Sequence, residues 1–158
     1  MVEHCRGTTV IRTVAFVATL AGCATPDGEL VVPGADPATF QTMVYPILLR
    51  DCGFAACHGD RRRFFTVFGP GRTRLNRDTG PYDPATADEL AQTYTRARSM
   101  LLSPDGVRRS PLLRKPLAVS AGGAGHRGDD HWGASVFASK SDPRFQTLFF
   151  WATEQLSP

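Results

Sequence analysis

The sequence predicts a small all-α domain with long loops rich in glycine and proline. Three segments carry a helix start signal followed by apolar residues at helical spacing, whereas strand signals are weak throughout. The chain contains 15 glycines and 12 prolines, which indicates that much of it forms loops. Its 158 residues, less an N-terminal signal segment described below, suffice for one domain but not for two.

The first helix is predicted to open at Asp36 as N-cap, with Pro37 in its first turn. Pro46 should kink it, since proline lacks the N–H group that a helix interior requires. The helix then runs directly into Cys52. It presents three apolar residues on one face: Phe40, Val44 and Leu48.

Two further helices follow. Thr86 with Glu89 three residues later forms a capping box, and Gly106 lies beyond the end of that helix. Its apolar face consists of Leu90, Tyr94, Ala97 and Leu101. The last helix opens at Asp142 with Pro143 in its first turn. Its core-facing residues are Phe145, Leu148, Phe149 and Ala152.

The first helix leads into two cysteines, Cys52 and Cys57, that are closed by His58. Covalent haem attachment uses two thiols followed by a histidine, usually as C-x-x-C-H. Here the spacing is C-x-x-x-x-C-H, which resembles the longer attachment motifs of some multihaem cytochromes. In this interpretation Cys52 and Cys57 hold haem c as thioethers and His58 is the proximal iron ligand.

The longer spacing requires a non-helical turn. Residues five apart on a regular helix have Cα atoms about 8.6 Å apart, so the segment must bulge, and Gly53 should ease the bulge. A Cys52–Cys57 disulfide also needs a non-helical turn, because its Cα atoms must lie within about 7 Å. A zinc site built from Cys52, Cys57, His58 and a distant histidine is a third alternative.

The N-terminus resembles a bacterial lipoprotein signal. Residues 1–22 carry Arg6 and Arg12 and then a short apolar run, too short to span a bilayer. The run ends in Leu-Ala-Gly-Cys, which resembles a lipobox and implies cleavage before Cys23 and lipid attachment to its thiol. An ordinary signal peptide is the alternative. Residues 23–35 are then a tether, and residues 36–158 form the domain.

Export to an oxidising compartment limits the partners. The formal net charge is +3, and the arginines are spread along the chain, so nucleic acid is not expected. The expected partners are extracytoplasmic redox proteins and, through the lipid on Cys23, a bacterial membrane facing the periplasm or the cell exterior.

A resemblance covers nearly all of residues 38–152. The order of the segments FxxxVYPIL, CxxxxCHG, SPLLRKP, GHxG and DPxFxxLxxW is similar to that of the cytochrome c-like lipoproteins of deltaproteobacteria and planctomycetes. The resemblance implies a small cytochrome c-like domain, in which an N-terminal helix bearing the haem motif crosses a C-terminal helix with an aromatic residue near its end.

The distal iron ligand has several candidates. His126 lies in a glycine-rich segment that can fold over a ring, and it is the favoured ligand. His131 and Met100 are weaker candidates, and an open site is a further one. Met43 precedes the motif on its own helix and is poorly placed. Two imidazoles would lower the reduction potential relative to a His/Met pair.

The sequence therefore predicts a membrane-anchored, single-haem electron carrier rather than an enzyme. Two alternatives come from other functional classes. One is a non-redox structural or binding lipoprotein without a cofactor, in which Cys52 and Cys57 form a disulfide. The other is a haem enzyme or sensor with an open distal site, such as a peroxidase-like module.

Overall fold

The computed structural model describes residues 35–126 and 135–154. Extended pairing within these ranges is limited to two isolated bridges, so the prediction of an all-α domain is confirmed. The α-helices are α1 (Pro37–Thr39), α2 (Tyr45–Asp51), α3 (Ala87–Ser99), α4 (Pro111–Arg114) and α5 (Pro143–Ala152). A π-helical turn, η1 (Phe40–Val44), joins α1 to α2, and two 3-10 turns are η2 (Val107–Arg109) and η3 (Val119–Ala121).

Helices α1 and α2 form one continuous helical segment with the π turn η1 inside it. Asp36 caps the segment by accepting a hydrogen bond from the Thr39 N–H group, as predicted. The expected disturbance at Pro46 takes the form of this π turn: the Tyr45 N–H group donates to the Phe40 carbonyl, five residues back. The pattern of backbone hydrogen bonds therefore shifts immediately before Pro46, which has no N–H group to donate.

Helix α3 begins with the predicted capping box, and both of its reciprocal hydrogen bonds are present. The predicted apolar face is correct only in part. Ala97 and Leu101 are buried, but Leu90 is only partly buried. The side chains of Glu89 and Thr93 are fully buried instead.

These buried polar groups hold the loop between α2 and α3. Glu89 makes an ion pair with Arg74, with 2.8 Å between Oε2 and Nη2, and both side chains are buried. The Arg74 guanidinium also donates to the carbonyls of Gly80, Asp83 and Pro84. A buried charge needs such partners, and the periodicity of apolar residues cannot reveal them.

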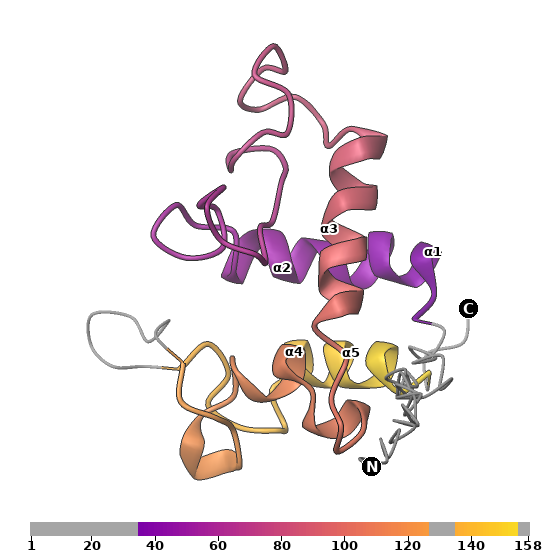
Figure 1. Cartoon of the computed structure of the whole chain (residues 1–158), viewed down its shortest axis with the longest axis vertical. Coiled ribbons are helices and arrows are strands. Elements are labelled where there is room, and N and C mark those ends of the chain that lie inside the picture. Colours follow the sequence, from indigo (N-terminus) through magenta and orange to yellow (C-terminus); the bar gives the residue numbers. More distant parts are fainter. Residues whose placement is uncertain (1–34, 127–134, 155–158) are drawn as a thin grey trace, which may run out of the picture.

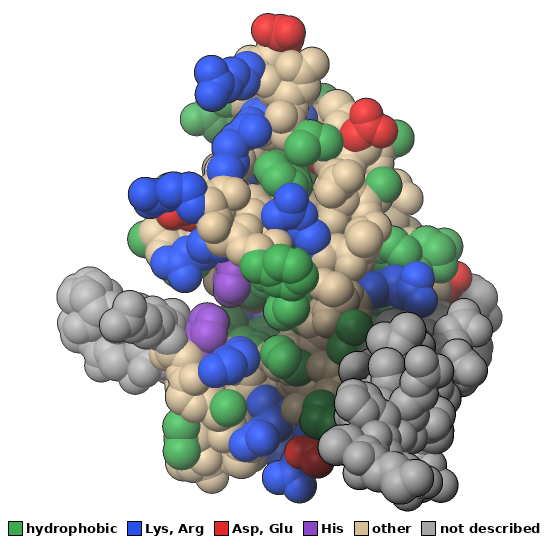
Figure 2. Space-filling model, viewed as in Figure 1, with side chains coloured by type: hydrophobic (Ala, Val, Ile, Leu, Met, Phe, Trp, Pro, Cys, Tyr) green, Lys and Arg blue, Asp and Glu red, His purple; other side chains and the backbone are tan. Residues whose placement is uncertain are grey.

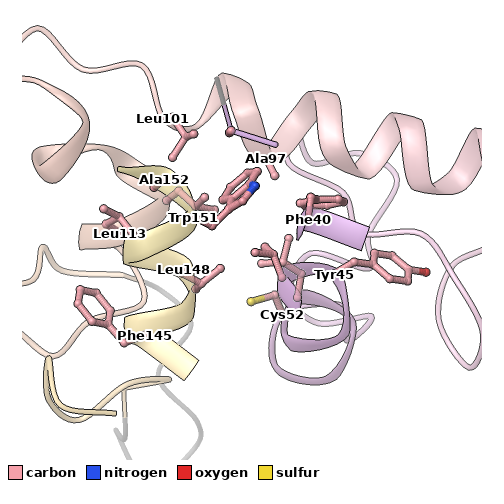
Figure 3. Packing of buried hydrophobic residues seen from close by; sticks show 14 of the residues in the cluster. Phe40, Tyr45, Cys52, Ala97, Leu101, Leu113, Phe145, Leu148, Trp151 and Ala152 are labelled. Atoms are coloured by element: carbon pink, nitrogen blue, oxygen red, sulfur yellow. The ribbon is translucent and has the colours of Figure 1, made fainter. Parts of the chain in front are cut away.

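Helix α5 packs against the N-terminal helical segment. The rings of Phe40 and Trp151 have centroids 5.4 Å apart, and the Trp151 indole N–H group donates to the Asp36 carbonyl. Figure 3 shows Leu148 and Trp151 reaching from α5 toward the N-terminal segment. The aromatic residue near the end of the last helix is thus a central core residue.

In Figure 1, α3 stands across the N-terminal segment, and α4 and α5 lie together below it. Ala35, the last residue of the predicted tether, is buried, and its carbonyl accepts a hydrogen bond from the Tyr94 hydroxyl. The predicted signal segment, 1–22, and the rest of the tether lie outside the described residues. None of the described helices is long and apolar enough to cross a membrane.

Candidate functional site

An apolar cavity lies between the end of α2, the end of α3 and the α4–α5 pair. Its walls bring together five candidate residues from distant parts of the chain: Cys52, Cys57, His58, Met100 and His126. The empty space is about 650 Å³, open solvent at the mouth included. Figure 2 shows the two described histidines, in purple, one above the other at a recess in the surface.

The segment that carries the cysteines leaves the helix where the sequence predicted a bulge. Helix α2 ends at Asp51, and the chain turns back so that the His58 N–H group donates to the Cys52 carbonyl at 2.9 Å. Gly59 makes this closure possible, because a Cβ atom there would lie 2.4 Å from the Gly53 carbonyl oxygen. The glycine after the histidine is therefore required by close packing.

An ion pair fixes the end of α2 relative to α5. Arg144, in the first turn of α5, places its Nη1 atom 3.3 Å from the Asp51 carboxylate. It also pairs with Asp142, the N-cap of the same helix. Cys52 follows Asp51 directly, and Figure 3 shows its sulfur pointing from the end of α2 toward α5. The contact between the two helices thus positions the first thiol.

His58 is oriented by a hydrogen bond of its own. Its Nδ1 atom lies 2.8 Å from the Phe65 carbonyl oxygen, which can only accept, so Nδ1 carries the proton. The Nε2 atom of the neutral ring is then the lone-pair nitrogen. Burial lowers the pKa of His58, which favours this neutral form. A metal-bound histidine commonly has this arrangement, with its other nitrogen donating to a carbonyl.

His126 faces His58 across the cavity. Their ring centroids are 5.8 Å apart and their planes differ by 19°. The segment before it is tied to α4, since the Ala124 N–H group donates to the Arg114 carbonyl at 2.8 Å and Lys115 donates to the Gly125 carbonyl at 3.1 Å. The glycine-rich segment therefore lies against α4 and directs its histidine to the cavity.

Both cysteines are free thiols, so the disulfide alternative is not formed in this structure. Cys52 is buried, and this burial raises the pKa of its thiol to about 12. Cys57 is partly buried and also lines the cavity. Both cysteines therefore line the same apolar space as His58.

The remaining predicted residues are placed as follows. Met100, at the C-cap of α3, lines the cavity, whereas Met43 is 45% exposed and is not among its lining residues. His131 and the lipid-attachment candidate Cys23 lie outside the described residues.

Several lining residues were not assigned to the site from the sequence. They come mainly from α4 and its flanks, within the SPLLRKP segment: Pro111, Leu112, Lys115 and Pro116. Only the family resemblance drew attention to this segment. Phe65 adds an aromatic wall, with its ring centroid 4.7 Å from that of His58.

The residues present fit a haem group. Two thiols, one oriented imidazole and a second imidazole surround an apolar space, which is the donor set that c-type attachment and bis-histidine ligation require. In the described part of the chain, no three His, Cys, Asp or Glu side chains are grouped to hold a metal ion.

Comparison with known proteins adds no relative. No family model matches the chain, no curated protein matches it, and no solved structure matches its fold.

Proposed function

We propose that this protein is a membrane-anchored, extracytoplasmic c-type cytochrome with a single haem, which transfers one electron at a time between redox partners. The observation that carries the proposal is the convergence of Cys52, Cys57, His58 and His126 on one apolar cavity. Haem supplies the redox chemistry. The lipid anchor on Cys23 and the cytochrome c-like fold belong to the same proposal and rest on the sequence.

Each residue has a defined role in this proposal. Cys52 and Cys57 would hold haem through thioether bonds, and His58 would ligate its iron through Nε2. His126 would be the distal ligand, with Met100 and His131 as its competitors. The apolar walls would place the cofactor in a low-dielectric environment.

The Phe65 carbonyl has a supporting role. By accepting a hydrogen bond from the Nδ1–H group of His58, it fixes both the tautomer and the orientation of the ring. A ligand that is oriented in advance loses less freedom when it binds. The carbonyl belongs to the backbone, so its contribution is preserved when the Phe65 side chain is replaced.

The direct test is covalent attachment. Protein produced with a haem-attachment system should retain its Soret band after acid–acetone extraction, and Cys52→Ala with Cys57→Ala should abolish that band completely. Cys23→Ala is the matched control: it should release the protein from the membrane without changing the spectrum. Extraction-resistant haem in the double variant would overturn the proposal.

A second test identifies the distal ligand. His126→Ala should convert a six-coordinate, low-spin spectrum into a high-spin one and should allow carbon monoxide to bind the ferrous form. His131→Ala should leave both properties unchanged. If His126→Ala stays low-spin while Met100→Ala or His131→Ala becomes high-spin, the distal assignment moves to that residue.

A further inference from the structure

A second hollow lies on the other side of helices α4 and α5. Leu112 of α4 and Leu148 of α5 line the cavity, whereas their neighbours Leu113 and Phe149 line this second space. We refer to it as the cationic groove. It holds about 890 Å³, open solvent included. Its floor is apolar and buried, and consists of Leu113, Leu117 and Phe145.

The rim of the groove is positively charged. Arg108 and Arg109 come from η2, Arg114 from α4, and Lys140 from the segment before α5. Among the described residues that line it, none is acidic. Four cations from three segments thus surround one apolar floor.

Most of these cations are not neutralised by any carboxylate that the structure describes and can therefore bind an external anion. Within the described ranges, neither Arg114 nor Lys140 has a hydrogen-bond or ion-pair partner for its side chain. Arg109 has only Asp105, at 3.9 Å, and both of these side chains are well exposed, so that pair is weak. The Arg108 guanidinium lies over the Phe149 ring, 4.9 Å from its centroid, which leaves its charge unneutralised.

The arginines that follow His58 differ from those of the groove, because their side chains are hydrogen-bonded within the protein. Arg62 pairs with Asp60 at 2.8 Å. Arg61 and Arg63 donate to backbone carbonyls, of Arg74 and Ala56 among others. Their hydrogen bonds stabilise the loop after α2. In the described part of the chain, the groove therefore gathers four cations of which only Arg109 has a carboxylate nearby, at 3.9 Å.

We propose that the cationic groove docks a protein partner that presents several carboxylates around an apolar side chain. The carboxylates would meet the rim, and the apolar side chain would reach the floor. Transient protein interfaces combine a small apolar centre with a charged rim in this way, and the rim mainly raises the rate of association. A flat anionic membrane would contact the rim but would not reach the recessed floor. The inference does not depend on haem.

The test uses a fluorescent peptide with four glutamates around a central phenylalanine, and measures its binding to the full chain by fluorescence anisotropy at low ionic strength. Arg114→Glu with Lys140→Glu should weaken binding about tenfold or more. The matched control is Arg62→Glu with Arg77→Glu, which changes the net charge equally outside the groove. It should change binding less than about twofold.

Three results would overturn the proposal: no binding of the peptide to the unsubstituted chain, an equal loss of binding in both double variants, or no loss of binding in the groove variant.

Binding to vesicles of anionic and of neutral lipid is measured in parallel. Groove-dependent binding to vesicles without binding to the peptide would assign the surface to a membrane instead. If the glutamate variant unfolds by circular dichroism, Arg114→Gln with Lys140→Gln replaces it, with an expected weakening of about threefold. The measurement is made on protein produced with and without the haem-attachment system, which keeps this result separate from that of the haem proposal.

Discussion

The cavity and the cationic groove are separated by the same two helices, yet their chemistry is different. The cavity side of α4 and α5 contributes Leu112 and Leu148 to an apolar space with two imidazoles. The groove side contributes Leu113 and Phe149 to an apolar floor under four cations. Successive residues on a helix point in different directions, so α4 and α5 can line the cavity with one face and the cationic groove with the other.

The two sites also differ in how their polar groups are satisfied. His58 is partly buried and has a hydrogen-bond partner for Nδ1. The rim of the groove is solvated, and water can satisfy Arg114 and Lys140 until an anion replaces it. Buried polar groups must find partners inside the protein, whereas exposed charges can remain available for other molecules. A polar side chain that is hydrogen-bonded inside the protein is therefore typical of a ligand-binding cavity. Solvated charges without internal hydrogen bonds are typical of a surface that binds another protein.

The largest expected effect is the loss of iron ligation in His58→Ala. If His58 is the proximal ligand, this variant should lose the low-spin haem spectrum entirely, because no other described imidazole is oriented by the Phe65 carbonyl. Binding of the acidic peptide to the groove should change less than about twofold, because His58 does not line it. Absorption spectroscopy and anisotropy measure the two effects. A parallel loss of both would show that the two sites are coupled.

A pair of neighbouring substitutions compares the two faces of α5. Leu148→Ala should lower the free energy of unfolding by about 2–5 kcal/mol, because Leu148 is 1% exposed and packs in the core. Phe149→Ala should cost about 1 kcal/mol, because Phe149 is only partly buried beside the groove. Urea unfolding of the two variants measures the difference. Equal costs would mean that the groove side belongs to the core as much as the cavity side does.

Acidification should destabilise the haem-free protein through His58. Burial lowers the pKa of this residue in the folded state below its ordinary value of 6.5. As the pH falls below 6.5, the unfolded chain therefore binds a proton that the folded chain does not. The free energy of unfolding should fall with a slope of at most about 1.4 kcal/mol per pH unit.

His58→Gln isolates this contribution, because glutamine does not titrate. Above pH 6.5 the difference in unfolding free energy between the two proteins should be constant, and below it the unsubstituted protein should lose stability relative to the variant. Urea unfolding between pH 5 and pH 8 checks the sign. A relative gain of stability at low pH would contradict the buried, neutral imidazole.

The smallest effect concerns the rim of the groove. Arg108→Met removes the cation over the Phe149 ring and should lower the free energy of unfolding by about 0.5–1 kcal/mol. Arg114→Met should change it by less than about 0.5 kcal/mol, because the Arg114 side chain has no partner in the described part of the chain. Thermal unfolding compares the two. A larger cost for Arg114 would show that the rim serves stability.

Much of the helical framework could be predicted because its signals are local. Asp36, the Thr86–Glu89 pair and Asp142 all cap the helices that the sequence placed after them. The apolar face of α3 was less predictable. Glu89 is buried because Arg74, far from it in the chain, supplies its charge partner. Spacing along one helix carries no information about such a partner.

The sequence by itself determined the positions of the helix starts and the turn between Cys52 and His58, and it singled out the C-x-x-x-x-C-H segment on which the haem proposal rests. These features depend on residues within one or two turns of each other, whose capping, spacing and thiol chemistry are local properties. Only the tertiary structure decided that His126 faces His58, that α4 walls the cavity, and that four cations converge on the opposite side. Those contacts join segments far apart in the chain, and their geometry follows from the packing of the whole core around Trp151 rather than from any one segment.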